Sequence, residues 1–136
     1  MLYVIHRGGQ GDLTYRGGQE PVLHLEADLE QAISWARGVG NRWAFTKSNA
    51  GAYYSDSWCD TSALSQVNWE AVAARQWSAP EVKEAKQAEF LVHESFPWHL
   101  LARVGVRTMQ MQERVETLLE QAGLATPVQV RTEWYY

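Results

Sequence analysis

The decapeptide Lys83-Glu84-Ala85-Lys86-Gln87-Ala88-Glu89-Phe90-Leu91-Val92 decides how the fold of the whole chain is interpreted. From Ala85 onward its residues alternate, which predicts a strand over residues 87–92 with one apolar face turned toward a core. The opposite face carries an amide and a carboxylate, Gln87 and Glu89, which point the same way. We therefore expect the sheet around this strand to present a polar pair at its surface.

A Gln-x-Glu pair on a strand is the arrangement that mono-ADP-ribosyltransferases use to act on NAD. In such a site the amide, here Gln87, holds a nucleophile or a ribose, and the carboxylate, here Glu89, faces the cation that forms as nicotinamide leaves. The alternative is a solvated strand face, on which polar residues alternate without any chemistry. The pair alone does not decide between these two interpretations.

The composition is that of one globular domain. With 136 residues, 46% of them hydrophobic and 21% charged, the chain is long enough to bury a single core. A net charge of -4 argues against a generally basic nucleic-acid binder but leaves room for a local basic patch. No apolar run approaches the length of a membrane span and no basic leader precedes a signal-like core, so we expect a cytoplasmic protein.

Metal chemistry has no support in the sequence. A lone cysteine, Cys59, cannot build a disulfide framework or a zinc site with several thiolates. His24, His93 and His99 lack the spacing of metal ligands, and we expect structural roles for them.

The expected secondary structure alternates strands with helices. Asp28, with Gln31 at the N3 position, predicts the start of a helix that ends at Gly38 or Gly40, and Gly123 closes a second helix. Strands are expected at residues 1–5, 22–26, 42–46, 87–92 and 127–131, and helices at residues 29–36 and 109–122. The order β-β-α-β-loop-β-α-β indicates an α+β fold.

Shorter segments have weaker signals. The tetrapeptide Arg-Gly-Gly-Gln occurs at residues 7–10 and again at residues 16–19, and both copies are predicted turns. Residues 96–101 indicate a buried turn that leads into one helical turn, and residues 134–136 indicate an aromatic strand end.

Residues 47–80 show little regular pattern apart from a short helical stretch around residues 64–74. An irregular segment of this length in a compact domain is usually a functional loop. Because the strand at residues 87–92 follows it, we expect this loop to deliver side chains to Gln87 and Glu89. The alternative is a surface excursion that holds one helix.

Several blocks stand in an order and spacing that resemble one family: Tyr15-Arg16-Gly17-Gly18-Gln19-Glu20-Pro21 with the strand at residues 22–26, Arg42-Trp43-Ala44-Phe45-Thr46-Lys47-Ser48-Asn49-Ala50, residues 82–91, and Phe96-Pro97-Trp98. They resemble the DarT toxins, bacterial enzymes that ADP-ribosylate thymidine in single-stranded DNA and are paired with a DarG-type macrodomain antitoxin. The resemblance spans essentially the whole chain, and its Lys-Gln-Ala-Glu-Phe block is far more specific than Gln-x-Glu alone.

The resemblance implies an ADP-ribosyltransferase-like split β-sheet fold, in a single domain over residues 1–136. It also implies NAD as the substrate, no metal, and Glu89 as the catalytic glutamate. Residues 48–89 would form the ADP-ribosylating turn-turn loop that meets the nucleic acid.

One departure from the family concerns the N-terminus. DarT proteins carry an upstream region, with an NAD-binding histidine and a catalytic arginine, before the strand that matches residues 1–5. His6 and Arg7 follow that strand, so these roles are not transferred to them. We therefore expect an N-terminally incomplete domain, the C-terminal two-thirds or so of such an enzyme, that is inactive or nearly so by itself. The alternative function is an inactive fragment that binds nucleic acid or antitoxin.

The remaining site residues follow from this assignment. Lys83 and Lys86 are expected to keep Glu89 ionised, and Gln87 is assigned to NAD or the acceptor, with a plain sheet-edge amide as the alternative. Segment 37–55 combines basic residues with aromatic rings and has no acidic residue, which suits single-stranded DNA. Trp43 and Phe45 are assigned to the core. The candidate DNA-binding residues are Lys47, Ser48, Asn49, Tyr53, Tyr54 and Trp58.

Overall fold

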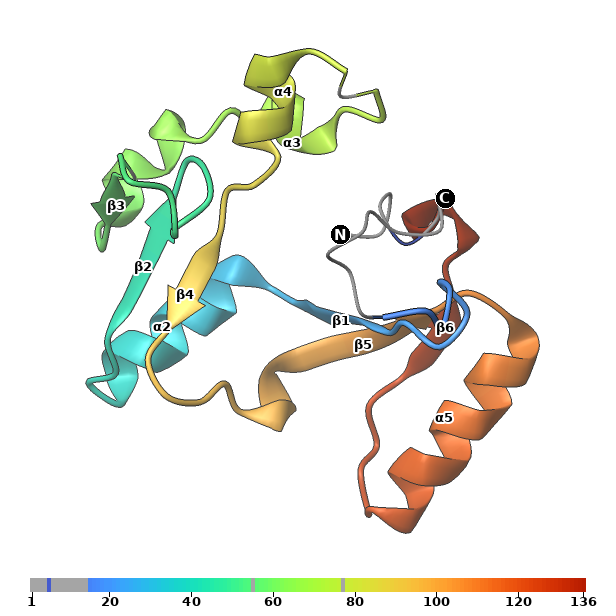
Figure 1. Ribbon diagram of the computed structural model, residues 1–136. Helices are drawn as coiled ribbons and strands as arrows, with labels where there is room; N and C mark the ends of the chain where they lie inside the picture. The colour runs from blue at the N-terminus through green and yellow to red at the C-terminus, as the bar shows by residue number, and fades with distance from the viewer. Residues whose placement is uncertain (1–4, 6–14, 55, 77) are drawn as a thin grey trace. The chain divides into compact units, whose positions relative to one another are not determined.

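A computed structural model describes residue 5 and residues 15–54, 56–76 and 78–136 (Figure 1). The chain divides into two compact units, the first formed by residues 1–32 with 97–136 and the second by residues 33–96. The strand expected at residues 1–5 lies outside the described residues except for Ile5, which is helical, and so does the turn at residues 7–10.

The sheet of the first unit contains β1 (His24–Ala27), β5 (Leu101–Val106) and β6 (Val128–Val130), in the order β1-β5-β6. β1 pairs antiparallel with β5, and β5 pairs parallel with β6. A parallel pair needs a long crossover connection, and helix α5 (Met109–Gln121) supplies it. Figure 1 shows α5 running beside β5 and β6.

Helix α5 begins and ends where local sequence predicts. The Thr108 side chain accepts a hydrogen bond from the backbone N–H of Met111, which caps the first turn. At the other end Gly123 has φ +67, and the N–H of Leu124 donates to the carbonyl of Leu119 at 2.8 Å. This is the Schellman arrangement, so the expected role of Gly123 is confirmed.

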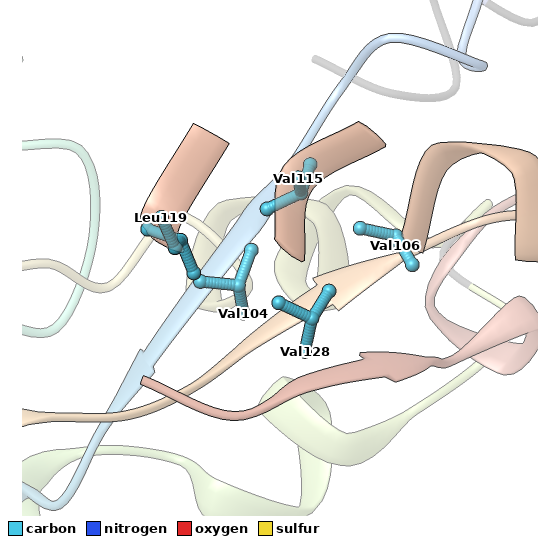
Figure 2. Packing of buried hydrophobic residues seen from close by; sticks show 5 residues of the cluster. All are labelled: Val104, Val106, Val115, Leu119 and Val128. Atoms are coloured by element: carbon cyan, nitrogen blue, oxygen red, sulfur yellow. The ribbon is translucent and has the colours of Figure 1, made fainter. Parts of the chain in front are cut away.

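The core of the first unit is aliphatic. One face of α5 packs on β5 and β6, and Figure 2 shows the buried side chains that meet there: Val104, Val106, Val115, Leu119 and Val128. Val104 and Val106 lie on the same face of β5 because alternate residues of a strand point the same way. They are 1% and 0% exposed and form the centre of this core.

The opposite face of β5 is covered by aromatic rings from the C-terminus. A Cβ atom at Gly105 would lie 2.3 Å from the ring of Trp134, so only glycine permits this close packing. The rings of Trp134 and Tyr135 contact the imidazole of His24 edge-on, and burial lowers the pKa of His24. Trp134 ends the 3-10 turn Thr132–Trp134, so the predicted aromatic strand end is wrong.

Helix α2 (Leu29–Gly38) confirms the capping prediction and settles its end. The N–H of Gln31 donates to the Asp28 carboxylate at 2.8 Å. Gly40, with φ +68, is the glycine that closes the helix, since the N–H of Asn41 donates to the carbonyl of Ala36.

Among the described residues, no helix is long and apolar enough to cross a membrane.

The sheet of the second unit contains β3 (Ser57–Trp58), β2 (Trp43–Thr46) and β4 (Phe90–Val92), in that order and all antiparallel. Phe45, on the central strand, is 3% exposed and stacks on Trp58 at 5.6 Å between ring centroids, which confirms its place in the core. Trp43 is half-buried against Phe90 and has the guanidinium of Arg37 over its ring.

The loop between β2 and β4 has more structure than its sequence predicts. It contains β3, the 3-10 helix Thr61–Gln66, α3 (Trp69–Ala73) and α4 (Pro80–Ala85). The helical stretch expected around residues 64–74 is two short helices because Asn68 starts a new one, its side chain accepting from the N–H of Ala71. Pro80 opens α4 as its first residue, which requires no N–H.

Besides the short β3, strand β5 was not predicted. Residues 96–101 do contain the expected single helical turn, Trp98–Leu100, but the chain then continues directly into β5. Gly105 weakens the strand signal of β5, and its packing against Trp134 explains why a glycine stands in a central strand. The predicted element order is therefore wrong at this point, although the α+β class is correct.

The packing on α5 predicts unequal effects of two adjacent leucines. Replacing Leu119, which is 8% exposed, with alanine should lower the free energy of unfolding by about 2–5 kcal/mol because it leaves a cavity. Replacing Leu118, which is 55% exposed, should change it by about 0.5 kcal/mol or less. Urea unfolding followed by circular dichroism measures both, and equal losses would contradict the packing described for α5.

Candidate active site and nucleic-acid interface

Gln87 and Glu89 stand just before a short strand rather than within a long one. After α4 the helical hydrogen bonding continues, because the N–H of Gln87 donates to the carbonyl of Glu84 and that of Ala88 to Ala85. β4 begins only at Phe90, so the strand predicted over residues 87–92 is wrong in its first half. The helix-forming sequence of α4 keeps the chain coiled up to Ala88, where the alternating pattern alone predicted an extended backbone.

Glu89 is held at both its backbone and its side chain. The N–H of Thr46 donates to the carbonyl of Glu89 at 2.9 Å, which extends the β2–β4 pairing by one residue. One carboxylate oxygen, Oε2, accepts a hydrogen bond from the backbone N–H of Ala50 at 3.1 Å. The residue is otherwise exposed to solvent, so its carboxylate is oriented and also accessible.

The amide of Gln87 is joined to the turn that carries Ala50. Its Oε1 accepts from Asn49 Nδ2 at 3.3 Å, and its Nε2 donates to the carbonyl of Lys83 at 3.1 Å. Asn49 also accepts from the N–H of Gly51 at 2.7 Å through Oδ1, and from the N–H of Ala52 through its carbonyl. Residues 49–52 thus form a tight turn that touches Gln87 through Asn49 and Glu89 through Ala50.

Lys86, one of the two lysines expected to keep Glu89 ionised, binds backbone carbonyls instead. Its ammonium donates to the carbonyls of Val72 and Ala74 at 2.7 and 2.6 Å, at the C-terminal end of α3. In the part of the chain that the structure describes, Glu89 forms no ion pair. Lys86 therefore holds α3 against the segment that leads into the site, where the helix dipole favours a cation.

The aromatic candidates lie on the exposed part of the same loop. Tyr53 and Tyr54 are 91% and 88% exposed, and their rings meet edge-on at 4.8 Å. Lys47 forms a 2.6 Å ion pair with Asp56, and its ammonium lies over the half-buried ring of Trp58. A nucleic acid could stack on the two tyrosines directly, whereas a phosphate would have to replace Asp56 at Lys47.

The structure thus brings some of the predicted site residues to the turn at residues 49–52 and leaves others exposed or buried elsewhere. Asn49 is hydrogen-bonded to Gln87, the N–H of the adjacent Ala50 donates to Glu89, and Tyr53 and Tyr54 follow on the exposed side of the same loop. Ser48 is only 4% exposed and faces the interior. Three residues that the sequence analysis did not select also contact the site: Thr46 and Ala50 bind Glu89, and Asp56 binds Lys47. The only sequence signal for Thr46 and Ala50 was their place in the block at residues 42–50.

Comparison with known proteins places this geometry in a family. The family model described as "DarT: ssDNA thymidine ADP-ribosyltransferase, DarT" matches residues 1–136. A relative named DNA ADP-ribosyl transferase, from Thermus sp. (strain 2.9), is 37% identical over 139 residues, which cover all of this chain and 63% of that protein. The chain thus spans less than two-thirds of the length of this curated relative.

Solved structures agree with this match. Thermus sp. 2.9 DarT in complex with NAD+ superposes with a TM-score of 0.88 at 33% identity, covering 99% of this chain and 66% of that one. Thermus sp. 2.9 DarT in complex with ADP-ribosylated ssDNA gives a TM-score of 0.87 at 36% identity, covering 99% and 63%.

The two three-stranded sheets and the match to solved structures define an ADP-ribosyltransferase-like split β-sheet fold, with Glu89 directly before β4. The family-model match extends over the full 136 residues and confirms the resemblance found in the sequence. The chain belongs to the DarT family.

Two substitutions at Asn49 should separate its two hydrogen bonds. Asn49→Asp keeps an oxygen for the N–H of Gly51 but loses the donor to Gln87, whereas Asn49→Ala loses both. We expect amide hydrogen exchange at Gly51 to accelerate in the alanine variant and to stay near wild type in the aspartate variant. Equal exchange rates in both variants would show that Oδ1 does not hold the turn.

Proposed function

We propose that this protein transfers ADP-ribose from NAD to thymidine bases of single-stranded DNA. The observation that carries the proposal is the Glu89 carboxylate, exposed but oriented by the N–H of Ala50, in a chain of the DarT family. The family description and the complexes of Thermus sp. 2.9 DarT with NAD+ and with ADP-ribosylated ssDNA support the substrates.

The proposed chemistry needs one well-placed carboxylate. The bond between the ribose C1′ and the nicotinamide nitrogen breaks, nicotinamide leaves with the electron pair, and an oxocarbenium-like cation remains. A thymine nitrogen supplies the pair for the new bond to C1′, and its proton passes to Glu89. A carboxylate about 4 Å from the cation, at an effective dielectric near 20, contributes roughly 4 kcal/mol of attraction. This is about a thousandfold in rate if the attraction acts only in the transition state.

Residues 48–89 serve in this proposal as the ADP-ribosylating turn-turn loop. The turn at residues 49–52 is hydrogen-bonded to both Gln87 and Glu89. These bonds fix the position of the loop segment before the tyrosines relative to the reacting groups. The Gln87 amide has one N–H and one oxygen lone pair left after its contacts with Asn49 and Lys83, and these can bind the ribose or the acceptor.

Single-stranded DNA would bind on the exposed side of this loop. Tyr53 and Tyr54 offer ring surface for bases, and each stacked base contributes about 1–3 kcal/mol. Lys47 would exchange Asp56 for a DNA phosphate, an exchange that costs part of the attraction gained. Stacking therefore supplies most of the affinity at this surface, and the phosphate contact adds a salt-dependent part.

The resemblance to DarT toxins extends the proposal to the cell. The protein would act as the toxin of a toxin–antitoxin pair, in the cytoplasm where bacterial DNA and NAD occur, and a DarG-type macrodomain antitoxin would be its partner. Co-expression with such an antitoxin should restore colony formation if DNA modification is the cause of toxicity.

A second candidate is a binding module without turnover. It is favoured by the two exposed tyrosines, which lie in the part of the chain that matches the DarT family. In this case single-stranded DNA or an antitoxin would bind to the chain, and no ADP-ribose would be transferred.

An oligonucleotide assay separates the two functions. With NAD and a thymidine-containing single strand, mass spectrometry should detect the addition of one ADP-ribose by the full-length domain, which includes the upstream region found in DarT proteins, and Glu89→Ala should abolish it. The 136 residues alone should transfer little or none. Glu89→Gln keeps the size of the side chain and should also be inactive, because the charge is lost. Binding without transfer would support the module, and transfer by the Glu89→Ala protein would remove Glu89 from the mechanism.

DNA binding should depend on the two rings rather than on their hydroxyls. We expect Tyr53→Ala and Tyr54→Ala each to weaken the affinity for a thymidine-rich single strand by roughly 5- to 150-fold. The matched variants Tyr53→Phe and Tyr54→Phe keep the stacking surface and should bind like wild type. Fluorescence anisotropy at constant salt measures this, and unchanged binding by both alanine variants would place the DNA elsewhere.

A further inference from the structure

Thr46 is a buried residue that contacts both segments of the candidate site, at Glu89 and at Ser48. It is the last residue of β2 and only 2% exposed. Its hydroxyl accepts the backbone N–H of Glu89 at 3.1 Å and donates to the carbonyl of Ser48 at 2.5 Å. Its own N–H donates to the carbonyl of Glu89 at 2.9 Å, so both backbone polar groups of Glu89 are bound by Thr46.

The hydroxyl takes a place that regular pairing would give to the backbone. In the β2–β4 register Phe45 faces Phe90, so the next pair is Thr46 with Glu89. In a regular hydrogen-bonded antiparallel pair, the N–H of each residue donates to the carbonyl of the other. Here one of the two goes to the side chain of Thr46 instead, which ends the regular ladder at Glu89.

The same hydroxyl also supports the turn that holds the carboxylate. Ser48, whose carbonyl it binds, directly precedes the turn at residues 49–52. The N–H of Ala50 in that turn donates to Glu89 Oε2. The contacts therefore close a ring from the backbone of Glu89 through Thr46, Ser48 and Ala50 to its carboxylate.

We propose that Thr46 is a positioning residue that aims the Glu89 carboxylate. This inference rests on the proposed function only in that Glu89 is taken as the catalytic group. Thr46 is buried, so it does not bind NAD or DNA itself. Only a side chain that both donates and accepts can bind an N–H and a carbonyl together, and serine shares this property whereas valine does not.

The kinetic consequence is specific to a positioning role. Thr46→Val keeps the shape of the side chain but leaves the N–H of Glu89 and the carbonyl of Ser48 without their partner. A misplacement of about 1 Å can cost roughly a hundredfold in rate. We expect kcat for ADP-ribose transfer to fall about 10- to 100-fold with the KM for NAD nearly unchanged, and Thr46→Ser to restore it.

A spectroscopic measurement tests the inference without requiring turnover. In two-dimensional 1H–15N spectra of the 136-residue chain, Glu89→Gln defines how the Ala50 amide resonance moves when the carboxylate charge is lost. Thr46→Val should move the same resonance away from its wild-type position, and Thr46→Ser should leave it nearly in place. Thr117→Val, which also removes a hydroxyl bound to a carbonyl, is the control and should not affect Ala50.

The possible outcomes are distinct. An unmoved Ala50 resonance in Thr46→Val, or wild-type kcat in that variant, would overturn the positioning role. If the full-length domain, with the upstream region found in DarT proteins, transfers no ADP-ribose, the proposed function fails, and the spectra still decide whether Thr46 holds the carboxylate. If Thr46→Val does not fold, amide exchange in the wild type decides, because rapid exchange at Glu89 or Ala50 contradicts the ring of hydrogen bonds.

Discussion

The hydrogen bond from the N–H of Ala50 to the carboxylate of Glu89 is the contact on which the site depends. It joins residues that are 39 positions apart, at the two ends of the β2–β4 loop. A carboxylate at the surface would otherwise sample several rotamers, and an N–H donor next to a short strand reduces that freedom. The exposed tyrosines stand three and four residues after Ala50, so the same contact relates the reacting group to the surface proposed for DNA.

The loop can meet this requirement because its other segments are anchored. Asn49 binds Gln87 at one end of the loop, and the ammonium of Lys86 binds the carbonyls that end α3. An irregular loop usually has many accessible conformations, and each such anchor reduces their number. Short helices α3 and α4 also satisfy the backbone groups of the segment locally, which lets its polar side chains serve the site.

Predictions from local sequence succeeded where the cause is local. The cap Asp28 and the closing glycine Gly123 were predicted, and Gly40 was one of the two glycines expected to end its helix, since each acts through hydrogen bonds within a few residues. Predictions failed where a distant partner decides. β5 is a strand because it pairs with β1 and β6, and the glycine within it is explained only by the ring of Trp134.

The sequence by itself determined the α+β class, the family and the candidate residues Gln87 and Glu89. These follow from alternating residues and from a specific block of residues, and both signals lie within a short contiguous stretch of the chain. Only the tertiary structure decided that Gln87 follows a helix rather than lying in a strand. It also decided that Ser48 is buried and that Thr46 binds Glu89. The contact between Thr46 and Glu89 arises from the pairing between β2 and β4, and hydrogen bonds between residues far apart in sequence leave no local pattern.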